Sequence, residues 1–273
     1  MAMRRARLGL LVLCACGGAP KPPAEPTPEP PAAQPAPAKL KLFVQVIDGD
    51  EPTILLEAGG GADSASWEAL PQRISEVTGR RVIAYDRAGF GKTPLPADDF
   101  TIAEEIDGLH SMLDEHGAKR VVIVAASYGA LFALYYTKQH PQNVAGLVLL
   151  DPMNADFVEA VGIDKVFSTV PKIKDPKTDK DRAIVRMVEK FPGFVTELRG
   201  VRWPASVPAV VISAARMPFS EDLHARWRAS HVALAKTAGA QHVEATNSGH
   251  DIAEDEPEVV ITAVKRVLAA RAN

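Results

Sequence analysis

From Lys39 to the C-terminus, short apolar runs alternate with segments in which apolar residues recur every three or four positions. Runs rich in Val, Ile and Leu are typical of buried strands, and the longer period is typical of helices. The expected strands cover residues 43–47, 53–57, 81–85, 121–125, 146–150, 209–213 and 241–245. The expected helices cover residues 66–78, 102–116, 128–140, 221–237 and 257–270. This order predicts an α/β domain in which helices cover both faces of a mostly parallel sheet.

The alternation is interrupted between residues 153 and 206. Helix-like patches at about 155–166 and 181–197 are separated there by prolines. The charged stretch at 172–182 is typical of a solvated loop or helix face. We therefore expect an insertion at 153–206 rather than an ordinary crossover between two strands.

The N-terminal region differs in character from the rest of the chain. Three arginines among the first seven residues precede an apolar run at 8–15, which is typical of a bacterial export signal and too short to span a bilayer. Residues 13–16 read LCAC and resemble a lipobox, the processing site at which the last cysteine is lipidated and becomes the new N-terminus. The resemblance implies a signal peptide over 1–15 and a lipid anchor at Cys16. The alternatives are a secretory signal cut by the ordinary peptidase and a chance apolar N-terminus.

A proline-rich stretch follows the candidate anchor. Nine of the nineteen residues from 20 to 38 are proline, and such a segment stays extended and works as a spacer. We expect an anchor and linker at 16–38 and a globular body at 39–273. Gly17 rather than an aspartate follows Cys16. The lipoprotein resemblance therefore implies attachment to the outer membrane of a bacterial cell envelope, facing the periplasm or exposed at the surface.

Composition and charge narrow the classes of partner. The chain has 273 residues, of which 47% are hydrophobic and 24% charged, with a net charge of -3. No excess of basic residues is left to neutralise a nucleic-acid backbone, so nucleic acid is not an expected partner. The only two cysteines are Cys14 and Cys16, both in the first segment, which argues against a structural zinc site. One catalytic domain without internal repeats is the expectation.

A candidate nucleophile lies where an expected strand meets an expected helix. The apolar run at 121–125 leads directly into a turn that carries Ser127. In the nucleophile elbow G-x-S-x-G, small residues flank the serine because the strained backbone leaves no room for larger ones. Residues 125–129 read AASYG, so Ala125 stands in place of the first glycine. The pattern indicates a catalytic serine, and the alternative is a buried serine that caps an ordinary turn.

With this elbow, the chain resembles the α/β-hydrolase family over about residues 40–273. Residues 58–61 read AGGG, and together with Trp67 they resemble the HGxG loop of the family, with alanine in place of histidine. The resemblance implies that the backbone N–H groups of Gly60 and Tyr128 form an oxyanion hole. A plain turn is the alternative for the glycines. The resemblance also implies that the insertion is a helical cap between the sixth and seventh family strands.

A second motif resembles the same family. Residues 85–91 read YDRAGFG and are similar to the family's DxRGxGxS segment, with alanine replacing one glycine. We expect Asp86 and Arg87 to hold this loop beside the site through hydrogen bonds, and we assign them no part in the chemistry.

His250 is the strongest candidate for the general base. It lies between the last expected strand and the last expected helix, where family members carry the catalytic histidine. An imidazole can accept the serine proton near neutral pH and pass it to the leaving group. Solvated or core roles are favoured for the other six histidines, which are His110, His116, His140, His224, His231 and His242.

The acid of the triad has two candidate positions. The family commonly places it after the penultimate strand, but no carboxylate stands at residues 213–218. The preceding strand ends at Asp151, and an acid at that earlier position resembles the arrangement in pancreatic-type lipases. A structural cap at the strand end is the alternative role for Asp151. In that case Glu221 or Asp222 would be the acid.

These residues predict a serine hydrolase that acts on an ester-like small molecule, either a carboxylic ester or a lactone. Ser127, His250 and Asp151 would form the triad, without a cofactor or metal. A serine nucleophile argues against the dehalogenase and epoxide-hydrolase branches, which attack with aspartate. The alternatives are a catalytically silent envelope protein that binds a ligand on this fold, and another triad enzyme such as a C–C hydrolase, a peptidase or a perhydrolase.

Overall fold

The computed structural model of the protein describes residues 40–167, 170 and 172–270. The expected signal peptide and the linker with Cys16 lie outside these residues. The described residues belong to one compact unit, Pro37–Asn273. Among them, no helix has the length and apolar character needed to cross a membrane.

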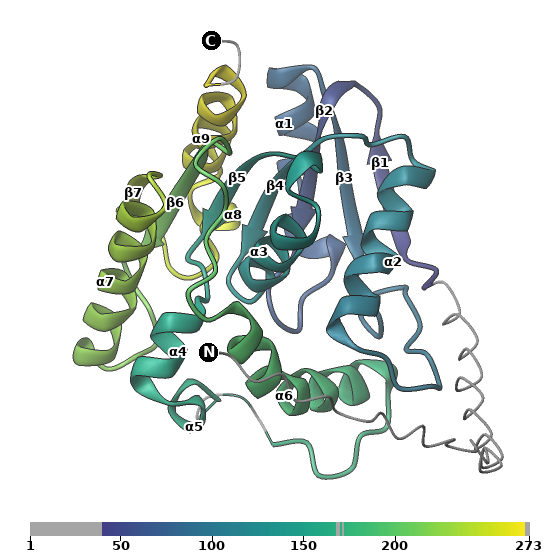
Figure 1. Ribbon diagram of the computed structural model, residues 1–273, viewed down its shortest axis with the longest axis vertical. Helices are drawn as coiled ribbons and strands as arrows, with labels where there is room; N and C mark the ends of the chain where they lie inside the picture. The colour runs from purple at the N-terminus through teal and green to yellow at the C-terminus, as the bar shows by residue number, and fades with distance from the viewer. Residues whose placement is uncertain (1–39, 168–169, 171, 271–273) are drawn as a thin grey trace, which may run out of the picture. The chain divides into compact units, whose positions relative to one another are not determined.

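A seven-stranded sheet forms the centre of this unit (Figure 1). The strands are β1 (Phe43–Ile47), β2 (Asp50–Glu57), β3 (Arg80–Asp86), β4 (Val121–Ala126), β5 (Val144–Leu150), β6 (Ala209–Ala214) and β7 (Gln241–Ala245). Their spatial order is β1-β3-β2-β4-β5-β6-β7. β1 runs antiparallel to β3, and all other neighbours are parallel. The central strands β4 and β5 are buried along nearly their whole length, as their continuous apolar runs require.

Helices cover both faces of the sheet. One face carries α2 (Ile102–Glu115), α3 (Gly129–Gln139) and α7 (Glu221–Thr237), whose apolar residues join one core cluster. The other face carries α1 (Leu70–Thr78) and α9 (Pro257–Ala269), which join a second cluster and contact each other. The short helices η1 (Ser64–Trp67), η2 (Pro141–Asn143) and α8 (Ile252–Asp255) complete these connections. The expected doubly covered sheet is confirmed.

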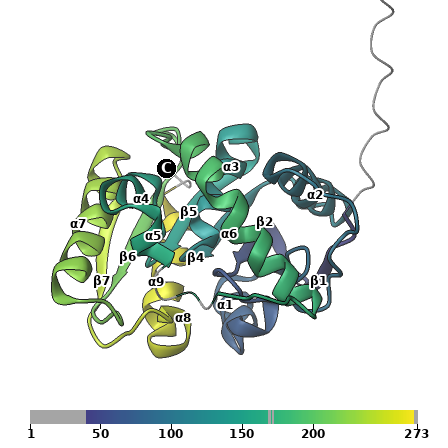
Figure 2. The ribbon, with the colours of Figure 1, turned by 90° about the horizontal axis from the view of Figure 1, so that it is seen from below.

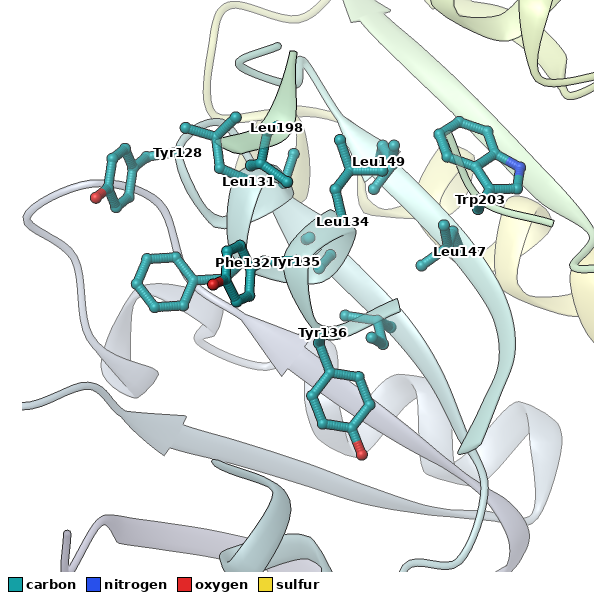
Figure 3. Packing of buried hydrophobic residues seen from close by; sticks show 14 of the residues in the cluster. Tyr128, Leu131, Phe132, Leu134, Tyr135, Tyr136, Leu147, Leu149, Leu198 and Trp203 are labelled. Atoms are coloured by element: carbon teal, nitrogen blue, oxygen red, sulfur yellow. The ribbon is translucent and has the colours of Figure 1, made fainter. Parts of the chain in front are cut away.

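The segment between β5 and β6, where we expect an insertion, contains α4 (Ala155–Val161), α5 (Ile163–Val166) and α6 (Asp179–Leu198). Seen from below, α6 runs across the lower end of the sheet (Figure 2). Its Phe194 ring packs edge-on against the rings of Phe132 and Tyr135, with centroids 5.2 and 5.7 Å apart. α3 and α6 are in contact, and Figure 3 shows Leu198 at the end of α6 near Leu131 of α3. This segment therefore packs directly on the helix that follows Ser127.

The helix expected at 66–78 is divided in two. η1 ends at Trp67, and Glu68 then takes φ 45°, a conformation that no helix accommodates. Pro71, whose ring fixes φ at a helical value, lies in the first turn of α1. The division places Ser66 and Trp67 beside the turn that carries Ser127, where they line a shared cavity.

Candidate active site

Ser127 lies at a sharp turn between β4 and α3. It adopts φ 47°, a left-handed conformation that is rare for residues other than glycine. Its N–H donates to the carbonyl of Leu150 at 2.9 Å, and its carbonyl accepts from Met153 N–H at 3.0 Å. The chain around Ser127 is thus tied to the end of β5. Strain held by surrounding contacts is typical of the nucleophile elbow.

The glycines around the elbow allow two backbone segments to approach closely. A Cβ on Gly129 would lie 2.5 Å from the carbonyl oxygen of Ala58, so only glycine fits there. A Cβ on Gly60 would lie 3.2 Å from Tyr128 Cβ, and one on Gly59 would lie 3.7 Å from Ser127 Cβ. The loop with the expected oxyanion donor Gly60 therefore runs beside the residue after Ser127.

Ser127 and His250 line one cavity of about 300 Å³. Gly59, Gly60 and Trp67 belong to the same wall, and Leu150 contributes the end of β5. Three further lining residues are carboxylates, namely Glu68, Asp251 and Glu254. The structure therefore brings the expected nucleophile, base and oxyanion loop to one site that carries negative charge at its rim.

Asp151 is fully buried and accepts a hydrogen bond from His250. Its Oδ2 lies 2.7 Å from His250 Nδ1, and its Oδ1 accepts from the N–H of Ala214 at 3.0 Å. Burial opposes the charge on Asp151, but the hydrogen bond from His250 and the nearby imidazoles hold its pKa below the ordinary value. Because a carboxylate only accepts, Nδ1 of His250 carries the proton and Nε2 is free to act as a base.

The backbone fixes the position of Asp151 at the end of β5. Asp151 adopts φ 42°, and its N–H donates to the carbonyl of Ile212 at 2.7 Å. The two alternative acids lie elsewhere: Glu221 and Asp222 are exposed in the first turn of α7, and Asp222 pairs with Arg226 at 3.2 Å. Among the described residues, Asp151 is the carboxylate that binds His250.

Arg87 and Glu57 form a buried ion pair beside the glycine-rich loop at residues 58–61. Their side chains are 3% and 1% exposed. Arg87 donates to Glu57, to the Ala58 carbonyl at 2.6 Å and to the Gly59 carbonyl. Tyr85 also donates to the Glu57 carboxylate. Burial raises the pKa of Glu57, while Arg87 and Tyr85 oppose that effect.

The expected structural role of Asp86 and Arg87 agrees with these contacts. Asp86 accepts from the N–H of Ser64 at 2.8 Å and from the N–H of Lys92 at 2.7 Å. Glu57 was not anticipated from the sequence. Its only signal is a carboxylate at the end of an otherwise apolar strand, directly before the glycine-rich loop.

Arg87→Met should destabilise the protein by about 3–5 kcal/mol, because it leaves the buried Glu57 carboxylate unpaired. Urea unfolding measures the change. Arg73→Met is the matched control, because Arg73 pairs with Glu258 at the surface and such pairs contribute little. Adding Glu57→Gln to Arg87→Met should recover part of the loss. Equal stability of the Arg87 and Arg73 variants would contradict the role given to the buried pair.

No group of three or more His, Cys, Asp and Glu side chains within residues 40–167, 170 and 172–270 is arranged to hold a metal ion. The arrangement around Ser127 instead consists of a hydroxyl, an imidazole bonded to a buried carboxylate, and a glycine-rich loop. Such a set can perform nucleophilic acyl transfer.

Comparisons with known proteins identify the fold as that of the α/β hydrolases. The model of the α/β hydrolase fold family matches residues 52–172. An uncharacterized protein of Bacillus subtilis, YqjL, is 26% identical over 221 residues, which are 80% of this chain and 84% of that protein. A proline iminopeptidase of Lactobacillus delbrueckii subsp. bulgaricus is 26% identical over 126 residues, which are 44% of this chain and 42% of that protein.

A solved structure covers more of the chain. The structure of a thermophilic esterase from Thermogutta terrifontis superimposes with a TM-score of 0.60 at 19% identity, covering 86% of this chain and 96% of that one. At this identity the likeness concerns the fold alone.

Proposed function

The chain has the α/β-hydrolase fold, and from this premise we propose that it is a serine hydrolase acting on ester-like small molecules. One observation carries the proposal: His250 lines the same cavity as Ser127, and its Nδ1 is hydrogen-bonded to the buried Asp151 carboxylate. In such a triad the carboxylate orients the imidazole, and the imidazole activates the serine hydroxyl for attack. Carboxylic esters and lactones are the proposed substrate classes.

In the proposed mechanism, Ser127 Oγ attacks the ester carbonyl carbon while His250 Nε2 accepts the hydroxyl proton. Negative charge that develops on the carbonyl oxygen is stabilised by the N–H groups of Gly60 and Tyr128. The tetrahedral intermediate collapses when His250 returns its proton to the leaving alcohol oxygen and the C–O bond breaks. Water, deprotonated by His250, then releases the acid and restores the serine. Asp151 keeps His250 in the required tautomer throughout.

We further propose that the insertion at 153–206 acts as a cap over this site. Met187 of α6 faces the oxyanion loop, since a Cβ on Gly60 would lie 3.5 Å from its sulfur. Phe191 and Phe194, also on α6, each place their ring centroids 6.0 Å from that of Tyr128. A segment packed this closely on both proposed oxyanion donors limits which acyl or alcohol groups enter.

The similarity to a proline iminopeptidase supports a second candidate, in which the same residues cleave an amide bond at a peptide N-terminus. A panel of neutral p-nitrophenyl esters of increasing acyl length, set beside aminoacyl p-nitroanilides, separates the two. Neutral esters suit the site because Glu68, Asp251 and Glu254 would repel an anionic acyl group. We expect hydrolysis of the esters. Preference for the anilides would favour the peptidase, and inertness towards both would favour the ligand-binding protein.

We also propose that Cys16 carries a lipid that holds the protein in the bacterial cell envelope. Cys16→Ser should move the protein from the membrane fraction to the soluble fraction, because it removes the thiol that would carry the lipid and the proline-rich spacer offers no apolar surface for attachment. Fractionation followed by immunoblotting measures the change, and Cys14→Ser is the matched control that should remain with the membrane. A Cys16 variant that still sediments with membranes would show that the lipobox interpretation is wrong.

A further inference from the structure

A network of polar side chains lies next to Asp151. His231 of α7 and Ser213 of β6 are both 0% exposed. His231 Nδ1 lies 2.9 Å from Ser213 Oγ, and His231 Nε2 lies 2.9 Å from the Pro152 carbonyl oxygen. Ser213 Oγ also lies 2.8 Å from Nε2 of His242 in β7. These contacts link β6, α7 and β7 to the turn that follows β5 and carries the proposed acid.

The hydrogen-bond chemistry of these groups fixes the direction of each bond. The Pro152 carbonyl only accepts, so His231 Nε2 carries a proton and donates to it. A neutral His231 then has its lone pair on Nδ1, so the Ser213 hydroxyl donates to that atom. Ser213 Oγ in turn accepts from the Nε2–H of His242. With His231 neutral, these directions give each of the three hydrogen bonds one donor and one acceptor.

The network ends at the turn formed by Asp151 and Pro152, where His231 bonds the Pro152 carbonyl and lies near the Asp151 carboxylate. His231 Nδ1 lies 3.7 Å from Asp151 Oδ1, the oxygen that also accepts from Ala214 N–H. The adjacent Pro152 carbonyl is held by His231, and Asp151 itself has φ 42°, a conformation that needs outside support. We propose that His231 and Ser213 are positioning residues, which hold the Asp151–Pro152 turn so that Oδ2 of Asp151 faces His250. The effect of these two residues on turnover rests on the proposed hydrolase function.

The charge state of His231 agrees with this role. Burial lowers the pKa of His231 to about 4, although the Asp151 carboxylate acts in the opposite direction. The other titratable groups that face it are His242 and His250, and both disfavour a positive charge on it. His242 lies in turn near Glu244 and Arg228. A neutral His231 leaves the Asp151 carboxylate to His250, whereas an imidazolium at this position would compete for it.

Two variants separate positioning from mere packing. His231→Phe keeps a ring of similar size but removes both hydrogen bonds, and Ser213→Ala removes a single oxygen. We expect kcat for a neutral ester to fall by about tenfold to 10²-fold in each, with KM little changed, because the substrate does not touch either residue. His231→Gln, which can donate to Pro152 and accept from Ser213, should recover part of the loss. His224→Phe, the same substitution elsewhere on α7, should leave kcat unchanged.

A readout that does not depend on activity completes the test. The Nδ1–H of His250, bonded to a buried carboxylate, should give a downfield proton resonance that is absent from His250→Gln. We expect this resonance to shift or broaden in His231→Phe and Ser213→Ala and to persist in His224→Phe. An unchanged resonance in folded Ser213→Ala, together with wild-type kcat, would overturn the inference even if His231→Phe fails to fold. If the proposed function itself is wrong, the wild-type protein will hydrolyse no ester, and this result is distinct from the outcomes above.

Discussion

Ser127→Ala should lower kcat for a neutral p-nitrophenyl ester by about 10⁴-fold or more, since loss of the nucleophile in a comparable triad costs about 10⁶-fold. The variant should fold normally. Serine and alanine both carry a Cβ and bear the same strain at φ 47°, and the turn is held by backbone bonds to Leu150 and Met153. Initial rates across substrate concentrations measure kcat, and thermal unfolding checks the fold.

The matched control for this loss is Ser66→Ala. Ser66 lines the same cavity, but its hydroxyl donates to the Asp63 carbonyl at 2.7 Å. Its removal should change kcat by less than about threefold. Unchanged turnover in a folded Ser127→Ala variant, or equal losses in the two variants, would mean that another group attacks the substrate.

Asp151→Asn should lower kcat by roughly 10²-fold to 10⁴-fold. The buried Oδ1 position would retain an oxygen, because the Ala214 N–H requires an acceptor there. The amide nitrogen of the new side chain would then face His250 Nδ1 and favour the tautomer whose proton lies on Nε2. That tautomer cannot accept the Ser127 proton. Rate measurements on the purified variant, normalised to the folded fraction, test this.

The other candidate acids supply the comparison for Asp151. Asp222→Asn and Glu221→Gln should leave kcat almost unchanged, because both side chains are exposed on α7 and Asp222 pairs with Arg226. If either of these variants loses activity while Asp151→Asn does not, the acid lies at the start of α7 and Asp151 is a structural cap. A loss in none of the three would mean that His250 works without these acids, with Asp251 the nearest remaining carboxylate in sequence.

Most of the fold could be predicted from the sequence, because apolar periodicity is a local property. All seven expected strands are present, and the helix at Glu221–Thr237 has the bounds that its pattern indicated. The break at Glu68 was not predicted, since a single residue with positive φ leaves no mark on hydrophobic periodicity. The short helix at Ile252–Asp255 has too few residues to display a period.

The candidate site could be predicted only where motif and chain order carried information. Ser127 was recognisable because a strand, a turn and a helix meet at a serine flanked by small residues. The sequence left Asp151 and the start of α7 as alternatives, because the spacing of residues does not say which carboxylate reaches an imidazole 99 positions later. The partners of Glu57 and His231 depend on side chains from separate strands and helices, so no sequence pattern revealed them.

The most direct test of the central claim is covalent labelling with a fluorophosphonate probe, followed by mass spectrometry of the intact protein and its peptides. Only an activated serine reacts readily with such a probe. We predict one adduct, located on Ser127, that disappears in Ser127→Ala and forms far more slowly in His250→Gln. Absence of labelling in the folded wild-type protein, or labelling that persists in Ser127→Ala, would contradict the assignment of Ser127 as the nucleophile.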